Sequence, residues 1–300
     1  MTSVHRPPVP ALRGLVASVW AQDPGPFASV ARRPVLEHVL PTGATHIAVR
    51  IGGEPLRIFD DAADRCGHRL GHAVVGGARK AYHLRDISQP SVSVGAVLRP
   101  GAAAVLLGAP ESALAGHHTP LECLLPAGEV DTLLSALHTC RESAGRLSVF
   151  EHWLCGRAGG RSSALHPALA GIVLRPVRHD MRVSELVRTS GLSHRHCIAV
   201  FRQATGLAPA EWLRLQCFSH ALDLACDASL GWAEIAAASG FADQAHLSNT
   251  FRAAAGLTPS AWRLQADPAT PCHVPCRAEA AGQIAARRRP VGTSQWRIVQ

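Results

Sequence analysis

One set of residues occurs twice in the second half of the chain, about fifty positions apart. The first copy contains Glu185-Leu186, Gly191, Phe201-Arg202, Gly206, Pro209 and Trp212, and the second contains Glu234-Ile235, Gly240, Phe251-Arg252, Gly256, Pro259 and Trp262. Self-similarity of this kind indicates that a single structural unit is used twice. The duplication therefore restricts this half of the chain to folds that hold two copies of one small motif.

Each copy is predicted to form a helix, a tight turn and a second helix. In the first copy, Gly191 can adopt the positive φ that the turn needs, and Ser193 can cap the second helix. In the second copy the first helix spans 232–239, Gly240 lies in the turn, and Asp243 caps the next helix. A turn this short makes the second helix cross the first, which is the geometry of a helix-turn-helix motif.

The outward face of each second helix carries side chains suited to contact with DNA. The amino-terminal half of such a helix can enter the major groove, where Arg pairs with guanine, Gln and Asn pair with adenine, and small apolar groups touch the thymine methyl group. The predicted base contacts are Arg195, Ile198 and Ala199 in the first copy, and Gln244, Ala245, His246, Ser248 and Asn249 in the second. The predicted phosphate contacts are Ser193, His194, Arg202 and Arg252.

The segment 211–225 is predicted to be a single helix that connects the two copies. Its apolar residues recur at helical spacing, and those expected to pack inward are Trp212, Leu215, Phe218, Leu222 and Leu224. A rigid connecting helix would hold the two second helices about one turn of DNA apart. One chain could then contact two successive major grooves.

The first half of the chain has the pattern of a β-rich domain. Apolar residues alternate with other residues in segments 46–51 and 91–98, and turns that contain Gly or Pro separate such segments. Apolar spacings of three and four in 130–140 and 147–154 predict two helices that close this domain. We therefore expect an α+β protein with two domains, the first β-rich and the second all-α.

Changes in composition mark the expected boundaries between these parts. Residues 156–163 combine Gly, Ser and Arg, as flexible connectors do, and the carboxy-terminal segment has prolines and no sustained apolar period. We expect a sensor or dimerisation domain at 1–155, a linker at 156–165, a DNA-binding domain at 166–265 and a flexible tail at 266–300.

Several motifs of the second copy resemble the signature of the AraC/XylS transcription regulators. They are Ile235-Ala236, Gly240-Phe241, Phe251-Arg252, Gly256-Leu257-Thr258-Pro259 and Trp262-Arg263. The resemblance covers roughly the last third of the chain. It implies a seven-helix DNA-binding domain with two helix-turn-helix units, usually joined to a variable sensor and dimerisation domain.

The resemblance also bears on individual residues of this sequence. It places the base-facing positions at Arg195, Ile198, Ala199, Ala245, His246, Ser248 and Asn249. The chain departs from the family pattern at Ile198 and Ala199, where polar or basic residues are common, and at Cys217, where arginine is common. Segments 39–43 and 97–102 are similar to the β-rich first domain of some actinobacterial members, which implies a cupin-like or related sensor fold.

The sequence thus predicts a transcription regulator that binds double-stranded DNA, and the resemblance favours an activator, which would contact RNA polymerase. A small-molecule effector and a homodimer are further expected partners, and a membrane is not. The nine cysteines show no paired spacings and the amino-terminal segment does not resemble a signal peptide, so we expect the protein in the cytoplasm. The net charge of +8 would suit an anionic partner, but it is spread along the chain and does not locate a binding surface.

The alternative left open by the sequence is an enzyme with the same DNA-binding appendage. It would be a β-barrel catalyst, or a DNA-repair protein that uses Cys272 or Cys276 as an alkyl acceptor. The chain has 17 histidines, but no His-x-His pair with a distant carboxylate appears at the spacing of a metal-dependent β-barrel enzyme. We therefore expect no catalytic residue, metal or cofactor.

Overall fold

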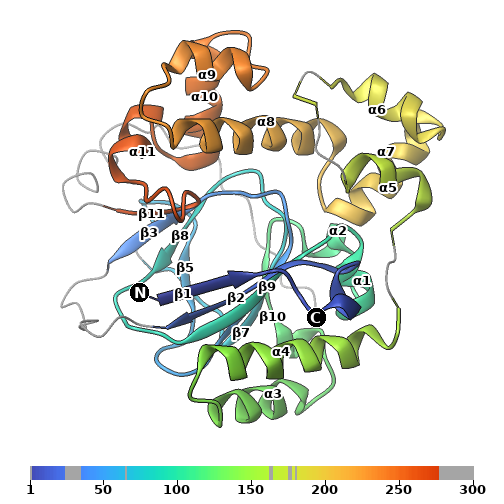
Figure 1. Cartoon of the computed structure of the whole chain (residues 1–300), viewed down its shortest axis with the longest axis vertical. Helices are drawn as coiled ribbons and strands as arrows, with labels where there is room; N and C mark the ends of the chain where they lie inside the picture. The colour runs from blue at the N-terminus through green and yellow to red at the C-terminus, as the bar shows by residue number, and fades with distance from the viewer. Residues whose placement is uncertain are drawn as a thin grey trace.

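The structure is a computed structural model that describes residues 2–23, 35–64, 66–161, 165–174, 178–179 and 181–276. A β-rich region extends to Ala158, and a helical region begins at Pro167 and lies over one side of it (Figure 1). This arrangement confirms the predicted α+β fold class. The predicted boundaries at 155 and 165 remain predictions, although the chain passes from one region to the other between those positions.

The strands of the β-rich region form two antiparallel sheets. The six-stranded sheet contains, in spatial order, β1 (Thr2–Arg6), β2 (Val16–Asp23), β9 (Ser93–Leu98), β4 (His46–Arg50), β7 (Ala73–Gly76) and β10 (His118–Pro120). The five-stranded sheet contains β11 (His273–Pro275), β3 (Leu36–Val39), β8 (His83–Asp86), β5 (Arg57–Phe59) and β6 (His68–Arg69). The two sheets approach each other at the ring of His83 on β8, 4.5 Å from that of His118 on β10.

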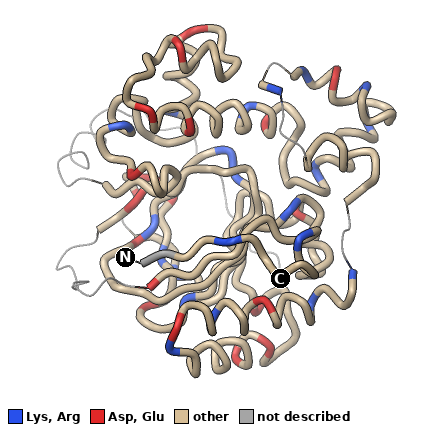
Figure 2. The backbone as a smooth tube through the Cα atoms, in the orientation of Figure 1, with Lys and Arg blue, Asp and Glu red and all other residues tan. Residues whose placement is uncertain are grey.

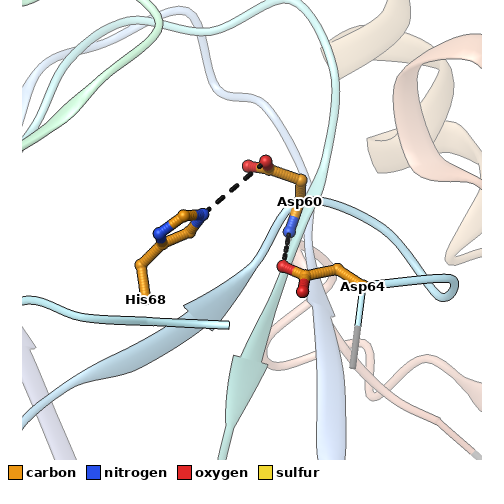
Figure 3. A group of neighbouring side chains, drawn as sticks. All are labelled: Asp60, Asp64 and His68. Atoms are coloured by element: carbon orange, nitrogen blue, oxygen red, sulfur yellow. Dashed lines mark hydrogen bonds and ion pairs between the residues drawn. The ribbon is translucent and has the colours of Figure 1, made fainter. Parts of the chain in front are cut away.

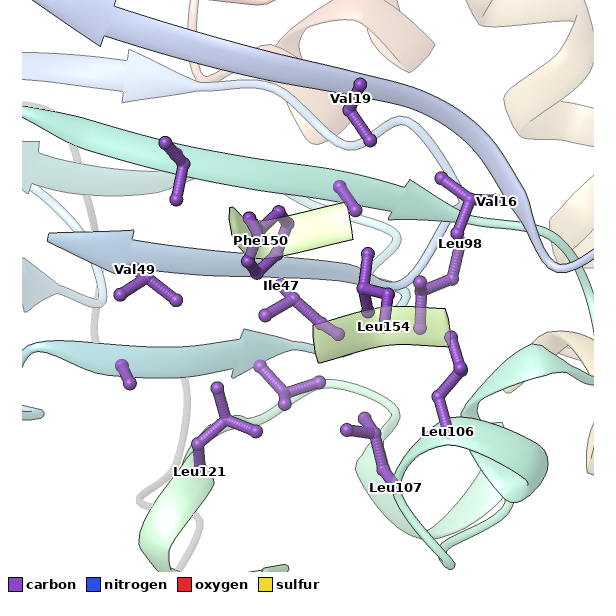
Figure 4. Close-up of a cluster of buried hydrophobic side chains, with 14 of the residues drawn as sticks. Val16, Val19, Ile47, Val49, Leu98, Leu106, Leu107, Leu121, Phe150 and Leu154 are labelled. Atoms are coloured by element: carbon purple, nitrogen blue, oxygen red, sulfur yellow. The ribbon is translucent and has the colours of Figure 1, made fainter. Parts of the chain in front are cut away.

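Helices cover the other face of the six-stranded sheet. They are α1 (Ala102–Leu106), α2 (Glu111–Leu114), α3 (Glu129–His138) and α4 (Ser143–Ala158), with the short 3-10 helices η1 (Pro10–Leu12) and η2 (Leu121–Cys123). The alternation along β4 directs Ile47 and Val49 to this face, where both are fully buried. They pack near Phe150 and Leu154 of α4 (Figure 4). The two closing helices predicted from apolar spacing are thus present as α3 and α4.

The helical region contains seven helices within the part of the chain that the structure describes. They are α5 (Pro167–Val173), α6 (Val183–Ser190), α7 (His194–Thr205), α8 (Pro209–Ala225), α9 (Trp232–Ala238), α10 (Gln244–Ala255) and α11 (Pro259–Gln265). Their apolar faces form one buried cluster that includes Phe201, Phe218, Phe251 and Trp262. The cluster extends into the β-rich region through Leu40 and Ala78, so the two regions share part of a core.

The tail differs from the prediction of a flexible segment over the part that is described. Trp262 Nε1 donates a hydrogen bond to the Pro271 carbonyl at 3.0 Å, and the following residues form β11. This strand pairs with β3 of the β-rich region, with Val274 opposite His38 and fully buried. Three residues are too few to show a strand period in a sequence, and the pairing depends on β3 offering a free sheet edge. Residues 277–300, which include Arg287 to Arg289, lie outside the described residues.

Candidate nucleic-acid interface

The second helices of the two units, α7 and α10, have the same length and the same caps. The side chains of Ser193 and Asp243 accept hydrogen bonds from the third backbone N–H of their helices, at 3.4 and 2.7 Å. Both helices span 12 residues and end at glycines, Gly206 and Gly256, that have φ values of 77° and 70°. The equivalence confirms that one structural unit is used twice.

Glycine is required in the turn of the second unit because the chain passes very close to it. Gly240 has a φ of 78°, and a Cβ atom there would lie 2.5 Å from the carbonyl oxygen of His179. In the first unit, Gly191 has a φ of 67°, but a Cβ atom would meet nothing within 4 Å. The glycine shared by the two copies thus has a conformational role in both, and a packing role in the second.

The inward faces of the two helices bury equivalent residues. Phe201 in α7 and Phe251 in α10 are fully buried, as are Cys197 and Leu247 one turn earlier. Phe251 makes an edge-to-face contact with Phe218 of α8 at a ring-centroid distance of 5.2 Å. These anchors set the rotation of each helix about its axis, and therefore decide which side chains face outward.

The outward faces carry all of the side chains predicted to contact DNA. On and before α7, Ser193, His194, Arg195, Ala199 and Arg202 are exposed and Ile198 is half-buried. On α10, Gln244, Ala245, His246, Asn249 and Arg252 are exposed and Ser248 is half-buried. A shallow surface depression of about 430 Å³ is lined by Gln244, Ala245, Ser248, Asn249 and Arg252. The geometry leaves these residues available to a partner, and their individual contacts with DNA stay predictions.

Two of the predicted base contacts have partners within their own motif. Arg252 Nη1 donates a hydrogen bond to Asn249 Oδ1 at 3.3 Å, one helical turn away. The ring of His246 accepts a hydrogen bond at Nδ1 from the Ala242 N–H at 3.4 Å and packs edge-to-face on Phe241. Its Nε2 is then the ring nitrogen that remains for a base. The i, i+3 spacing of Asn249 and Arg252 could have revealed the first contact in the sequence.

The connecting helix α8 lies between the two units, and α7 and α10 contact it toward opposite ends (Figure 1). Its predicted packing residues Trp212, Leu215, Phe218 and Leu222 are buried, whereas Leu224 is only half-buried. The atypical Cys217 donates its S–H to the His179 carbonyl at 3.4 Å. This thiol therefore takes part in packing against the segment that precedes α6.

Positive charge does not mark the interface. Lys and Arg occur over both regions of the molecule and are interspersed with Asp and Glu (Figure 2). The position of the candidate interface therefore rests on the matched helices, not on a basic patch.

The described residues hold one group of side chains close enough to share a metal ion. Ligand atoms of Asp60, Asp64 and His68 lie within 4.8 Å of one another on the surface of the β-rich region (Figure 3). Asp64 already accepts hydrogen bonds from three backbone N–H groups of its loop, those of Asp60, Cys66 and Gly67. Those bonds account for the position of Asp64 as a loop cap, and we assign no metal to the group.

The tail cysteines have environments that oppose thiolate formation. Burial raises the pKa of Cys272 to about 11, with added effects of Asp223 and Cys226. Burial also raises the pKa of Cys276 to about 11, and Glu37 contributes. Since the thiolate is the reactive form of cysteine, these thiols are poorly suited to act as alkyl acceptors.

Two family models match the chain. One, described as a helix-turn-helix domain, matches residues 186–265 and so covers both units built above. The chain carries an AraC-type helix-turn-helix domain. The AraC-type domain is preceded by a match of residues 4–120 to a family described as a domain of unknown function (DUF6597), which covers most of the two-sheet region.

A curated relative matches part of the chain. The HTH-type transcriptional regulator GlxA of Rhizobium meliloti (strain 1021) is 31% identical over 111 residues, which are 36% of this chain and 34% of that protein. The chain thus spans about a third of the length of this curated relative. Among the described residues, no helix has both the length and the apolar composition needed to cross a bilayer.

Two solved structures were also found to be similar. The DNA-binding domain of AdpA, solved in complex with a target DNA, is 31% identical, covers 29% of this chain and 78% of that one, and superposes with a TM-score of 0.28. ToxT from Vibrio cholerae is 10% identical, covers 88% of this chain and 99% of that one, and has a TM-score of 0.42.

Proposed function

We propose that this protein is a cytoplasmic, sequence-specific DNA-binding regulator of transcription. The observation that carries the proposal is the pair of matched helices α7 and α10, which have equivalent caps and anchors and expose their amino-terminal halves. Both contact the single helix α8, whose buried apolar face makes it a rigid spacer. This arrangement would let one chain place α7 and α10 in two successive major grooves of DNA.

The two helices would read DNA in different ways. The exposed side chains of Gln244 and Asn249 on α10 suit hydrogen bonds to adenine, whereas Ile198 and Ala199 on α7 suit contact with thymine methyl groups. Arg202 and Arg252 occupy equivalent exposed positions one turn further along and suit the phosphates. Most of the hydrogen-bonded sequence readout is therefore assigned to α10.

We propose that the β-rich region controls α7 and α10 through backbone hydrogen bonds to equivalent carbonyl groups near the ends of the two helices. Gly101 N–H donates to the Ala204 carbonyl of α7 at 2.8 Å, and Tyr82 N–H donates to the Ala254 carbonyl of α10 at 2.7 Å. Ala204 and Ala254 hold the same position in the two copies, two residues before the terminal glycine. The last carbonyls of a helix lack partners within the helix, so they are free to accept such bonds.

Further contacts reinforce this link at each helix end. A Cβ atom on Gly206 would lie 2.9 Å from the Glu111 carbonyl oxygen, and one on Gly256 would lie 2.4 Å from the Tyr82 ring. His38 Nδ1 also donates to the Ala255 carbonyl at 3.0 Å. An effector that moved the loops at 82 and 101 relative to each other would change the arrangement of α7 and α10, with a coupling of about 1–3 kcal/mol.

The proposal also includes activation through RNA polymerase and a homodimer, because the AraC/XylS resemblance implies them. We propose that the protein acts by binding DNA and not by catalysis. The raised pKa values of the Cys272 and Cys276 thiols favour this over the repair-enzyme alternative.

The experiment that tests the function is selection of binding sites from random DNA with the full-length protein. We expect an enriched motif with two parts, separated by about one helical turn, of which the part contacted by α10 is the better defined. The triple variant Gln244→Ala, Ser248→Ala, Asn249→Ala should lose that part and keep the other. Recovery of no motif would count against sequence-specific binding.

A further inference from the structure

Lys80 is the only lysine among the 30 lysine and arginine residues of the chain. Both residue types form ion pairs with carboxylates, but they differ in chemistry. A guanidinium stays charged, whereas the primary amine of a lysine can be acylated and then loses its positive charge. Lys80 is therefore the one side chain of this protein at which acylation can turn a cation into a neutral amide.

The loop between β7 and β8 that carries Lys80 is fixed on both sides of this residue. Before it, Gly77 N–H donates a hydrogen bond to the His117 carbonyl at 2.9 Å. After it, Tyr82 N–H donates to the Ala254 carbonyl of α10 at 2.7 Å. One end of the loop is thus bonded to the β-rich region and the other to the helical region, and Lys80 lies between these two bonds.

The Lys80 side chain joins the two regions. Its Nζ lies 3.0 Å from Glu211 Oε1 in the first turn of α8. Among the ion pairs of the described residues, this is the only one between the β-rich region and helices α5 to α11. The lysine side chain is nevertheless 71% exposed, so a small reagent can reach the amine without any opening of the fold.

Glu211 is held in place independently of Lys80. Its Oε2 accepts a hydrogen bond from the Ala208 N–H at 3.0 Å, in the cap at the start of α8. That hydrogen bond lowers the pKa of the Glu211 carboxyl, with smaller effects of Lys80 and Arg202, and burial opposes them. The carboxylate is therefore kept in position without the lysine, and loss of the lysine charge removes the ion pair.

We propose that Lys80 is an acylation site and that its acylation releases the β-rich region from α8. The donor is an activated acetyl group, as in an acyl phosphate or an acyl thioester. The ammonium group loses a proton to water, and the amine nitrogen then attacks the acetyl carbonyl carbon. A new N–C bond replaces the C–O bond to phosphate or the C–S bond to the thiol. The leaving group takes the electron pair of the broken bond, and the nitrogen gives up its extra proton to water. The resulting amide is neutral and cannot form an ion pair with Glu211.

Acetylation of Lys80 should weaken DNA binding, and this consequence rests on the proposed function. Helix α8 lies between α7 and α10, and the β-rich region contacts the ends of both. Without the ion pair α8 is less firmly fixed, so the two helices are less well preorganised for two successive grooves. Exposed ion pairs are weak, so the affinity for the selected DNA site should fall only about two- to fivefold.

The modification is tested by mass spectrometry of the full-length protein after incubation with acetyl phosphate or with acetyl-CoA. We expect one acetyl group on Lys80, formed alongside reaction of the amino-terminal amine, which serves as an internal standard in the same chain. Lys80→Arg should leave the amino-terminal amine as the only acetylated amine. Reaction of the amino-terminal amine without acetylation of Lys80, with both donors, would overturn the proposal.

The release is tested by fluorescence anisotropy with the selected DNA site. The acetylated protein, Lys80→Gln and Glu211→Gln should each bind about two- to fivefold more weakly, whereas Lys80→Arg should bind as the unmodified protein does. The matched control is Arg69→Gln, which removes an arginine that is 70% exposed and paired with Glu54, and should leave the affinity unchanged. Equal weakening by Arg69→Gln, or tighter binding by Glu211→Gln, would show that only net charge matters and would reject the release.

Failure of this inference can be distinguished from failure of the proposed function. If no DNA motif is selected, the regulatory role is rejected, but mass spectrometry still detects the acetylation. Urea denaturation still detects the ion pair, because Lys80→Gln should lower the midpoint in the natural chain and not in the Glu211→Gln variant. Equal lowering in both would show that Lys80 and Glu211 are not coupled, which would refute the release without any use of DNA.

Discussion

Substitution of one glycine at the end of α7 tests whether the β-rich region holds this helix in solution. Gly206 has a φ of 77°, and its missing Cβ faces the Glu111 carbonyl oxygen at 2.9 Å and the Ala115 Cβ at 3.1 Å. Gly191 has a φ of 67°, but nothing lies within 4 Å of the corresponding Cβ position. The two glycines therefore share their backbone conformation and differ in their contact with the β-rich region.

The magnitudes follow from this difference. An alanine in the left-handed conformation costs about 1–2 kcal/mol at either position. At Gly206 the new methyl group must also displace the backbone of α2, and overpacking of this kind costs about 1–3 kcal/mol more. Gly206→Ala should therefore lower the free energy of unfolding by about 2–5 kcal/mol in all, against about 1–2 kcal/mol for Gly191→Ala.

The assay is urea denaturation of the full-length variants followed by tryptophan fluorescence. Trp212 is a suitable reporter because it packs edge-to-face on Phe201 of α7 at a centroid distance of 5.4 Å. Equal destabilisation by the two substitutions would refute the reasoning, because it would mean that α2 does not lie against the end of α7 in solution.

Three other predictions concern DNA and pH. Asn249→Ala should weaken binding to the selected site by about 1–3 kcal/mol and binding to random DNA very little; equal weakening in fluorescence anisotropy would exclude base reading. Arg252→Ala should weaken binding to the selected site and to random DNA alike, and should reduce the slope of log affinity against log salt concentration by about one. An unchanged slope would exclude a phosphate contact. Burial raises the pKa of Glu111 to about 7, against the opposing effect of backbone N–H donors such as that of Ala103. The Glu111 carboxyl then binds a proton more readily in the folded state than in the unfolded state. The free energy of unfolding should therefore fall by up to about 3 kcal/mol as pH rises from about 4.5 to 7. Glu111→Gln should abolish this fall in thermal melts across that range, and persistence of the fall would assign it to another group.

The signature residues near the carboxy-terminal end of the AraC-type domain stabilise the fold and do not line the DNA-binding helix. Arg263 stacks over the ring of Trp232 at 4.0 Å and donates to the carbonyls of Ala225 and Leu230 at 3.2 and 3.1 Å. These bonds cap the end of α8 and hold α11 against α9. At these positions the family motif therefore reflects the architecture of the domain, whereas the residues of α10 that we propose to read bases lie outside it.

The local features of the helical region could be read from the sequence. Helix caps and terminal glycines act within four residues, and apolar anchors such as Leu247 and Phe251 repeat with the helical period. The positions of the two units and the outward faces of α7 and α10 follow directly from those short-range rules. The contact of Asn249 with Arg252 follows from their i, i+3 spacing on a helix, so the sequence is sufficient to predict it as well.

The contacts that link the two regions could not be read in this way. Tyr82 with Ala254, Gly101 with Ala204, and β11 with β3 join backbone groups far apart in the chain, and a backbone N–H carries no residue-specific signal. The rings of His46, His83 and His118 are likewise brought together from strands of two different sheets. The sequence by itself determined a duplicated helix-turn-helix domain behind a β-rich region, because periodicity and capping are local. Only the tertiary structure decided how the β-rich region contacts both α7 and α10, because those contacts depend on which distant segments pack together.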